Sequence, residues 1–205
     1  THCTPLVAKS VMDYPVTSAG SAAELGYNPL IKEVEDVTAK YVGKEAAVVV
    51  GMGFATNSTV IPAIAGKGDL IVSDALNHNS IVEGARLSGA KVKAFKHNCV
   101  GDLELIFQDA VAGKQRYNKI LVIIEGIYSM EGELCCLPEI VEVCKLYGAY
   151  VWLDEAHSIG AIGKTGRGVC EELGVDPKDV DIMMGTFTKS FGAAGGYVAG
   201  DYETV

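Results

Sequence analysis

The sequence is poor in basic residues. Its 17 lysines and arginines stand against 26 acidic residues, so the formal net charge is -9. Nucleic acids and anionic membrane surfaces select for clustered Lys and Arg because their own charge is negative. We therefore expect neither nucleic acid nor an anionic membrane surface as the main partner of this chain.

Long apolar runs and patterned cysteines are missing as well. No run approaches the ~18 apolar residues of a membrane-spanning helix, and the N-terminal THCTPLVAKS has no apolar signal-peptide core. The six cysteines include no Cys-x-x-Cys pair and have no histidine spacing typical of zinc sites. We expect reduced, buried thiols and no metal, and we assign no role to the adjacent Cys135 and Cys136.

What the chain does contain is a regular alternation of two kinds of segment. Hydrophobic residues make up 49% of the 205 residues, which is enough for a sizeable core in one domain. Short runs rich in β-branched residues predict buried strands. Helix-like segments lie between them, which favours an α/β fold whose mostly parallel central sheet carries helices on both faces. The predicted strands are 46–50, 69–73, 91–95, 119–125, 150–156 and 181–187.

Two of the predicted helices have clear end signals. Asn28 can cap a helix that begins with Pro29 and stops before Gly43. A second helix opens at Leu137 and ends at Gly148. Each has an apolar stripe that we expect to face the core. The stripes are Leu30, Val34, Val37 and Tyr41 in the first helix, and Val141, Cys144 and Leu146 in the second.

In sheets of this kind, ligands bind at the carboxyl ends of the strands. The first strand is followed by GMGFAT (51–56), whose glycines let backbone N–H groups approach an anion at the start of the next helix. Thr56 stands where a dinucleotide fingerprint has its third glycine, so a single phosphate fits better than NAD. A glycine-rich turn without a ligand is the alternative. The triplet Asn57-Ser58-Thr59 matches a glycosylation acceptor, but no signal peptide supports that use.

Asp154 ends the apolar strand YVWLD. An unpaired ionised carboxylate in such a place is costly, so we expect a cationic or hydrogen-bonding partner. A helix-capping or strand-end role is the alternative. A protonated pyridine nitrogen, as in pyridoxal 5′-phosphate (PLP), is an apt partner. His157, three residues later, could reach a polar group on the same ring.

Other predicted strands also end in polar groups. His78 follows the strand 69–73, where it can cap the next helix or stack on an aromatic cofactor. Glu125 ends the strand 119–125 and Ser129 lies just after it, and they offer a carboxylate and a hydroxyl. Lys189 lies in GTFTKSFGAAGGY (185–197), between Thr-rich and Gly-rich flanks. A lysine so framed can bond covalently to the carbonyl group of a bound cofactor.

Together these motifs resemble the α-oxoamine synthases, which are PLP enzymes of fold type I. The resemblance runs in order from about Ser18 to Gly200 and is strongest to the lysine-bearing long-chain-base subunit 2 of serine palmitoyltransferases. It implies that residues 1–205 are an incomplete PLP-binding large domain that lacks the C-terminal small domain. The motifs are GMGFATNS, SDALNHNSIVEGARLSGA, IEGIYSMEG, YVWLDEAHSIGAIGKTGRG and DIMMGTFTKSFGAAGGY.

The resemblance also implies a role for each candidate residue. Lys189 would hold PLP covalently, and Asp154 would pair with the pyridinium nitrogen. His157 would bond to the phenolic oxygen of the ring, and His78 would stack on the ring and orient the substrate. The remaining candidates are Gly53, Phe54, Thr186 and Thr188 at the phosphate, Ser129 at the cofactor, and Glu125 on the substrate side.

The implied reaction is the condensation of L-serine with a long-chain acyl-CoA such as palmitoyl-CoA. Carbon dioxide and CoA leave, and 3-ketosphinganine is formed for sphingolipid biosynthesis. The implied partner is a lysine-free subunit of the same family, or a second copy of the chain. Full-length proteins of this kind are expected on the cytosolic face of the endoplasmic reticulum membrane, although this chain has no transmembrane segment of its own.

Two other functions stay open at this point. One is a sister enzyme that condenses glycine or alanine with a different acyl-CoA. The other is a shortened, non-catalytic chain that binds a full-length partner subunit. The sequence departs from the family pattern at Ala194, where a small polar residue is usual, and at Leu30, near the place of a histidine. These departures concern contacts to the substrate more than contacts to the cofactor.

Overall fold

The computed structural model describes residues 5–14, 20–21 and 26–205. Ser18, where the family resemblance begins, and the first four residues lie outside this range. The elements in chain order are α1 (Pro5–Asp13), α2 (Pro29–Val42), β1 (Ala46–Val50), α3 (Gly53–Ile64), β2 (Leu70–Asp74), α4 (Asn79–Leu87), β3 (Lys91–Phe95), α5 (Val100–Ala112), β4 (Ile120–Glu125), β5 (Ile127–Tyr128), β6 (Glu133–Leu134), α6 (Leu137–Tyr147), β7 (Tyr150–Asp154), α7 (Val169–Leu173), the 3-10 helix η2 (Pro177–Asp179), β8 (Ile182–Thr186) and β9 (Gly196–Gly200).

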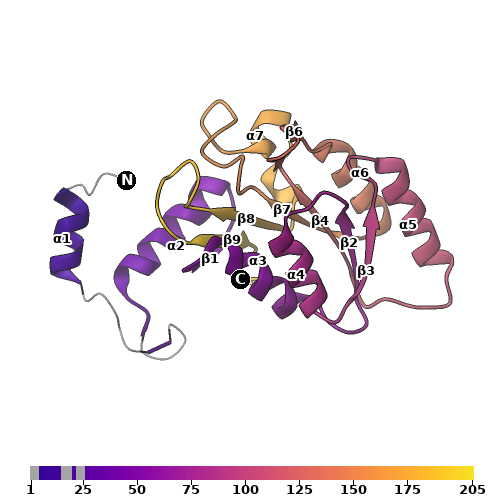
Figure 1. Ribbon diagram of the computed structural model, residues 1–205, viewed down its shortest axis with the longest axis horizontal. Coiled ribbons are helices and arrows are strands. Elements are labelled where there is room, and N and C mark those ends of the chain that lie inside the picture. Colours follow the sequence, from indigo (N-terminus) through magenta and orange to yellow (C-terminus); the bar gives the residue numbers. More distant parts are fainter. Residues whose placement is uncertain (1–4, 15–19, 22–25) are drawn as a thin grey trace.

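One seven-stranded sheet organises the described residues, in the order β1-β9-β8-β7-β4-β2-β3 (Figure 1). The strands β3, β2, β4, β7 and β8 are parallel, whereas β9 runs antiparallel to both of its neighbours. The predicted mostly parallel α/β sheet is thus confirmed. Strand β9 was not among the predicted strands, because the glycines at both of its ends carry little β propensity.

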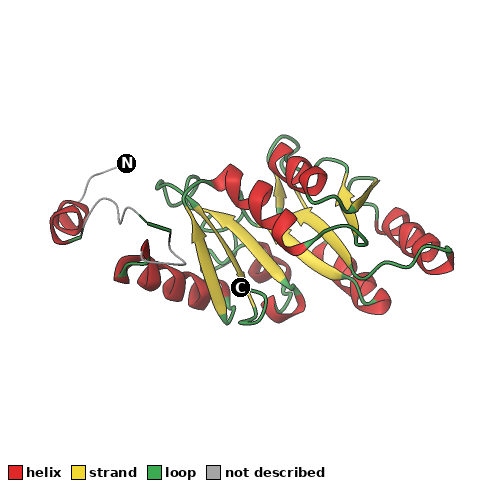
Figure 2. Cartoon of the chain, turned by 90° about the horizontal axis from the view of Figure 1, so that it is seen from below, coloured by secondary structure: helices red, strands yellow, loops and turns green. Residues whose placement is uncertain are grey.

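Successive residues of the strands pack into two separate cores, and helices lie on both faces of the sheet (Figure 2). Ile71, Ile123 and Trp152 pack with α3 and α4 on one face of the sheet. Val122 and Leu153 pack with α5, α6 and α7 on the other face. Side chains alternate between the two faces of a strand, so a strand that is buried on both faces must be apolar throughout. This is why the strands appear in the sequence as continuous apolar runs.

Helix α2 has the predicted ends but a different buried face. Asn28 Oδ1 accepts a hydrogen bond from Ile31 N at 3.1 Å, and Gly43 ends the helix at a left-handed φ of 78°. The predicted inward stripe is wrong for Val34 and Val37, which are 41% and 62% exposed. The smaller Ala39 and its neighbours let the helix approach the sheet closely, so the helix turns the larger side chains outward. The buried residues are Thr38, Ala39 and Val42.

Helix α6 confirms most of its prediction. Val141 and Cys144 are buried, and Gly148 ends the helix in the left-handed conformation. Leu146, predicted to face inward, is 73% exposed. Two residues along a helix correspond to a rotation of about 200°, so Leu146 cannot share the face of Cys144.

The described cysteines lie mostly inside the protein. Cys135, Cys144 and Cys170 are buried, and burial raises the pKa of each thiol, which makes these groups poor nucleophiles at neutral pH. Among the described helices, none combines the length and the apolar character needed to cross a membrane.

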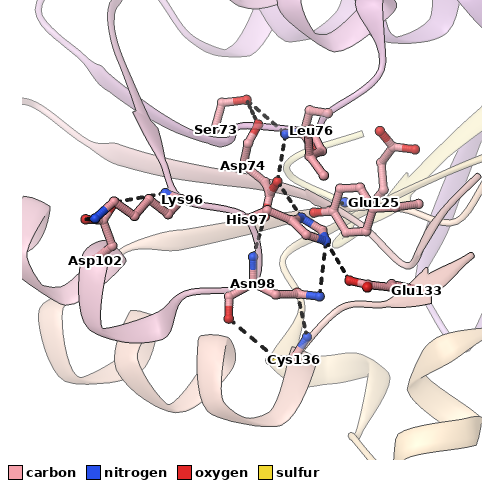
Figure 3. A network of polar contacts seen from close by, with 12 residues as sticks. Ser73, Asp74, Leu76, Lys96, His97, Asn98, Asp102, Glu125, Glu133 and Cys136 are labelled. Carbon is pink, nitrogen blue, oxygen red and sulfur yellow. Dashed lines mark hydrogen bonds and ion pairs between the residues drawn. The ribbon is translucent and has the colours of Figure 1, made fainter. Parts of the chain in front are cut away.

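A polar network joins the ends of β2 and β3 to the hairpin of β5 and β6 (Figure 3). His97 Nδ1 lies 2.9 Å from Asp74 Oδ1, and His97 Nε2 lies 3.2 Å from Glu133 Oε2. An imidazolium satisfies both contacts, because both of its nitrogens carry hydrogen. Burial lowers the pKa of His97, but the hydrogen bonds and charges of Asp74 and Glu133 outweigh burial and raise it overall.

This network also fixes the strand end that carries Glu125. The Tyr128 ring packs edge-on against His97 with ring centroids 4.4 Å apart. Its hydroxyl accepts the backbone N–H of Glu125 at 3.2 Å. Asp74, the buried anchor of the network, additionally accepts the backbone N–H of Asn98 at 3.1 Å. The network therefore holds the last residue of β4 in place through contacts that lie outside the main sheet.

We predict that His97→Gln destabilises the fold more at pH 6 than at pH 9. The raised pKa means that protonated His97 stabilises the folded state. That stabilisation is complete below the unfolded pKa of about 6.5 and fades as the pH rises through the higher folded pKa. A hydrogen bond to a charged group contributes about 1.5–3 kcal/mol, so we expect a loss of that size at pH 6. Urea unfolding at the two pH values measures the difference.

The matched control for this test is Lys96→Gln, which removes an exposed cation next to His97. Lys96 is 81% exposed and lies 3.9 Å from Asp102, so its loss should change stability by less than about 1 kcal/mol. Equal losses at both pH values for His97→Gln would contradict the charged network.

Candidate active site

The carboxyl ends of several strands and the start of α3 surround one cavity. Glu125, at the end of β4, pairs in register with Asp154 at the end of β7, and Asp154 pairs with Met184 of β8. All of the predicted candidates except Ser129 line the cavity. The lining residues are Gly53, Phe54, Asn57, His78, Ser80, Glu125, Asp154, Ala156, His157, Met184, Thr186, Thr188 and Lys189.

Ser129 lies away from the cavity. The chain leaves the main sheet after Glu125 and forms the short hairpin of β5 and β6, and Ser129 is exposed in the turn of that hairpin. The geometry of this chain therefore does not support the predicted cofactor contact of Ser129.

Asp154 is a buried carboxylate held by neutral donors. Its Oδ1 accepts the N–H of Ala156 at 2.8 Å, and its Oδ2 accepts the side-chain amide of Asn57 at 2.7 Å. Burial raises the pKa of Asp154 overall, although these hydrogen bonds and the nearby charge of Lys189 oppose the rise. Within the described part of the chain no cation forms an ion pair with Asp154. A cationic N–H donor of a ligand would fit there.

Glu125 is the second buried carboxylate of the site. Burial, followed by the neighbouring charge of Asp154, raises its pKa to about 8. At pH 7 the group is therefore mostly protonated and neutral. Its Oε1 accepts the backbone N–H of His78, which ties the end of β4 to the turn after β2.

The start of α3 and two threonines form a small cradle for an anion. The N-cap residue Met52 makes no side-chain bond to the first turn of α3, so the N–H groups of that turn are open to a ligand. A Cβ at Gly53 would lie 2.7 Å from Thr186 Oγ1, so only glycine leaves this space clear. Thr186 Oγ1 donates to Gly195 O at 3.0 Å and lies 2.8 Å from Thr188 Oγ1, so Thr188 is the hydroxyl that can turn toward the cradle as a donor.

Lys189 lies in the loop that connects β8 to the antiparallel β9. The loop is closed by backbone hydrogen bonds from Phe187 N to Gly195 O at 3.0 Å and from Ala193 N to Phe187 O at 2.8 Å. His157 lines the cavity with Lys189. Burial lowers the pKa of His157, and the positive charge of Lys189 lowers it further, so His157 is neutral at pH 7.

His78 caps a helix and also lines the cavity. It is the N-cap residue of α4, where its Nδ1 accepts the N–H of Ser80 at 3.2 Å. Its ring also lines the cavity and lies edge-on to Phe54 with centroids 6.1 Å apart. Capping and contact with a ligand are therefore compatible in this residue.

The sequence reasoning missed four lining residues: Asn57, Ser80, Ala156 and Met184. Asn57 drew attention only as a glycosylation triplet, but its side chain is buried at 1% exposure and the folded chain cannot present it. Its spacing of four residues from Gly53 places both on one face of α3, and this signal could have identified it.

The comparisons with known proteins agree with this geometry. The sequence model of the aminotransferase class I and II family matches residues 1–205. The long chain base biosynthesis protein 2c of Oryza sativa subsp. japonica is 59% identical over 209 aligned residues, which cover 100% of this chain and 42% of that protein. Serine palmitoyltransferase 3 of Homo sapiens is 54% identical, with 96% of this chain and 37% of that protein covered.

Solved structures show the same similarity. The serine palmitoyltransferase of Sphingomonas wittichii superimposes with a TM-score of 0.88 at 37% identity, covering 95% of this chain and 48% of that one. A serine palmitoyltransferase variant from S. paucimobilis with a bound PLP–myriocin aldimine gives a TM-score of 0.87 at 35% identity, covering 94% and 47%. The chain thus spans less than half the length of the curated relatives it matches.

We predict that Glu125→Gln stabilises the fold at pH 8 and has little effect at pH 5. The folded pKa of about 8 lies above the model-peptide pKa of about 4.3. The wild-type side chain therefore loses stability as the pH rises through this window, while Gln keeps the acceptor for His78 N–H and cannot ionise. A gain of about 1 kcal/mol corresponds to a rise of ~2–4 °C in Tm, which thermal melting at the two pH values measures. The exposed Glu142→Gln on α6 is the control, and an equal shift in both variants would contradict the assignment.

Proposed function

The chain belongs to the aminotransferase class I and II family, and from this premise we propose that it is the PLP-binding part of a serine palmitoyltransferase subunit. The observation that carries the proposal is the convergence of Lys189, Asp154 and His157 on one cavity beside an anion cradle. The identity of 59% to a long chain base biosynthesis protein directs the choice within the family.

The residues of the cavity fit PLP group by group. Asp154, buried and paired only with neutral donors, would hold the N–H of a pyridinium ring. The first turn of α3 with Thr186 and Thr188 would hold the phosphate. Lys189 supplies the amine for a covalent bond to the cofactor's aldehyde carbon. Bound PLP supplies an electron-withdrawing ring that stabilises negative charge on the α-carbon of an amino-acid substrate.

The side chains of the cavity have separate roles in the proposed reaction. Lys189 Nζ is the group we assign to take the α-proton of L-serine, because it is the amine that lines the cavity. Asp154 would carry the negative charge that pairs with the ring nitrogen, since a cation there would oppose the effect of burial on its pKa. His157 stays neutral and can donate a hydrogen bond to an oxygen of the ring. Glu125, protonated at pH 7, adds no second negative charge to the site.

For the whole protein we propose the condensation of L-serine with a long-chain acyl-CoA to 3-ketosphinganine, with release of CoA and carbon dioxide. We also propose a lysine-free subunit of the same family as the partner, or else a second copy. The cytosolic face of the endoplasmic reticulum membrane is the proposed location of the full-length protein. The relatives named as serine palmitoyltransferases support the proposed reaction.

Two alternatives are separable from this proposal. A sister enzyme with another amino acid is disfavoured, because a solved 8-amino-7-oxononanoate synthase is only 25% identical to this chain. A shortened, non-catalytic chain that binds a full-length partner is the other alternative. Product analysis with serine or glycine and palmitoyl-CoA, with and without the partner subunit, distinguishes these alternatives.

We predict that reduction with borohydride in the presence of PLP labels the chain on Lys189. Mass spectrometry of the digested chain locates the label. Lys189→Ala should lose it, and so should Lys189→Arg, because a guanidinium cannot form the covalent bond at neutral pH. The matched control is Lys164→Ala, which removes an exposed lysine from the neighbouring 160–168 loop and should retain the label. Label spread over surface lysines would refute the cofactor role and favour the partner-binding alternative.

A further inference from the structure

Asn57 is buried between two polar groups that belong to different parts of the fold. Its Nδ2 donates to Asp154 Oδ2 at 2.7 Å and to Ser80 Oγ at 3.0 Å. All three residues are at most 3% exposed. A side-chain amide has two N–H bonds, and each of these contacts uses one of them.

The orientation of this amide is set by the carboxylate. The reverse orientation would direct Asn57 Oδ1 at Asp154 Oδ2, which would bring two acceptors together in a buried place. In the observed orientation Oδ1 is buried and has no partner among the described residues. An unsatisfied buried acceptor costs free energy, so the bond to Asp154 must be the stronger determinant.

A hydrogen bond between Ser80 and His78 extends this chain of contacts. Because Ser80 Oγ accepts from Asn57, its own hydrogen is free to donate to His78 Nδ1, which lies 2.9 Å away. The backbone N–H of Ser80 points at the same nitrogen at 3.2 Å. His78 Nδ1 therefore faces two donors. In a neutral imidazole one nitrogen accepts and the other carries the hydrogen, so the hydrogen of His78 belongs on Nε2.

We propose that Asn57 and Ser80 are positioning residues that link the Asp154 carboxylate to His78 and hold His78 as the tautomer with its hydrogen on Nε2. The proposal rests on the proposed function, because Asp154 and His78 need a bound cofactor to act on. Asn57 orients Asp154 toward the position of a ring nitrogen. Ser80 leaves His78 with one defined donor, its Nε2–H.

The first experiment addresses the tautomer in the chain without cofactor. Proton–nitrogen correlation spectra of the imidazole groups should show His78 with its hydrogen on Nε2 in the wild type. Ser80→Ala should shift both ring-nitrogen resonances toward a mixture of tautomers, and Ser80→Thr, which keeps the hydroxyl, should restore them. Ser58→Ala, the same change next to Asn57 but outside the network, is the control. A wild-type hydrogen on Nδ1, or no shift in Ser80→Ala, would overturn the role of Ser80.

The second experiment addresses Asp154 through the cofactor. Absorbance titration should show that Asn57→Ala weakens PLP binding about tenfold or more, since a hydrogen bond to a charged group is lost. An analogue with carbon in place of the ring nitrogen does not engage Asp154, so Asn57→Ala should change its affinity less than about twofold. Equal losses for PLP and the analogue would reveal a purely structural role of Asn57 and overturn its assignment.

Failure of the proposed function gives a different pattern. If the wild-type chain binds neither PLP nor the analogue, the proposed function fails, and the link from Asn57 to a cofactor fails with it. The tautomer of His78 is still decided by the spectra of the cofactor-free chain. A variant of Asn57 that does not fold leaves the Ser80 variants to decide the linkage, because Ser80→Ala removes one hydroxyl from the same chain of hydrogen bonds.

Discussion

The site depends on how the fold accommodates two carboxylates at neighbouring strand ends. Asp154 and Glu125 face each other in register on adjacent parallel strands, and such strands lie only about 4.8 Å apart. Both groups are buried. Two ionised carboxylates at this separation repel each other in a medium of low dielectric. The structure lowers this repulsion by giving Asp154 two strong hydrogen bonds and by keeping Glu125 protonated at neutral pH.

Helix α3 and the loop after β7 lie around these carboxylates and help to hold them. Helix α3 supplies both the amide that binds Asp154 and the first turn of the anion cradle, so its packing against the sheet serves both ends of one ligand. Glu155, the next residue along the chain, is buried on the opposite side. It accepts hydrogen bonds from Ser158 and from Val169 N, which anchors the loop after β7. Burial raises the pKa of Glu155 to about 7, while its hydrogen bonds from Ser158 and Val169 N oppose the rise.

Features that depend on local chemistry were predictable from the sequence. The β-branched runs gave the parallel strands, and Asn28, Pro29 and Gly43 gave the ends of α2, because these signals act within a few residues. The rotation of α2 was not predictable, since it depends on how closely Ala39 approaches the sheet. The position of Ser129 outside the cavity was not predictable, because the sequence does not show that the chain after Glu125 turns away into a hairpin.

Prediction of the candidate site from the sequence has the same limit, because it also depends on local signals. Lys189, Asp154, His157 and His78 stand out because each lies at or just after the end of a predicted strand, and motif resemblance groups them. Asn57 lies 97 residues from its partner Asp154, and only the folded sheet brings them together. Side chains that act on a cofactor are thus visible in the sequence, whereas side chains that orient them are visible in the structure.

The charge balance also couples the two carboxylates to any cation in the cavity. The charge of Asp154 contributes to the raised pKa of Glu125. A pyridinium placed against Asp154 would neutralise that charge and so lower the pKa of Glu125. By linkage, ionised Glu125 would in turn favour the cation. Because burial raises the pKa of both Asp154 and Glu125, a cationic ring at Asp154 would stabilise the ionised carboxylates, and without the ring the protonation of Glu125 limits their repulsion.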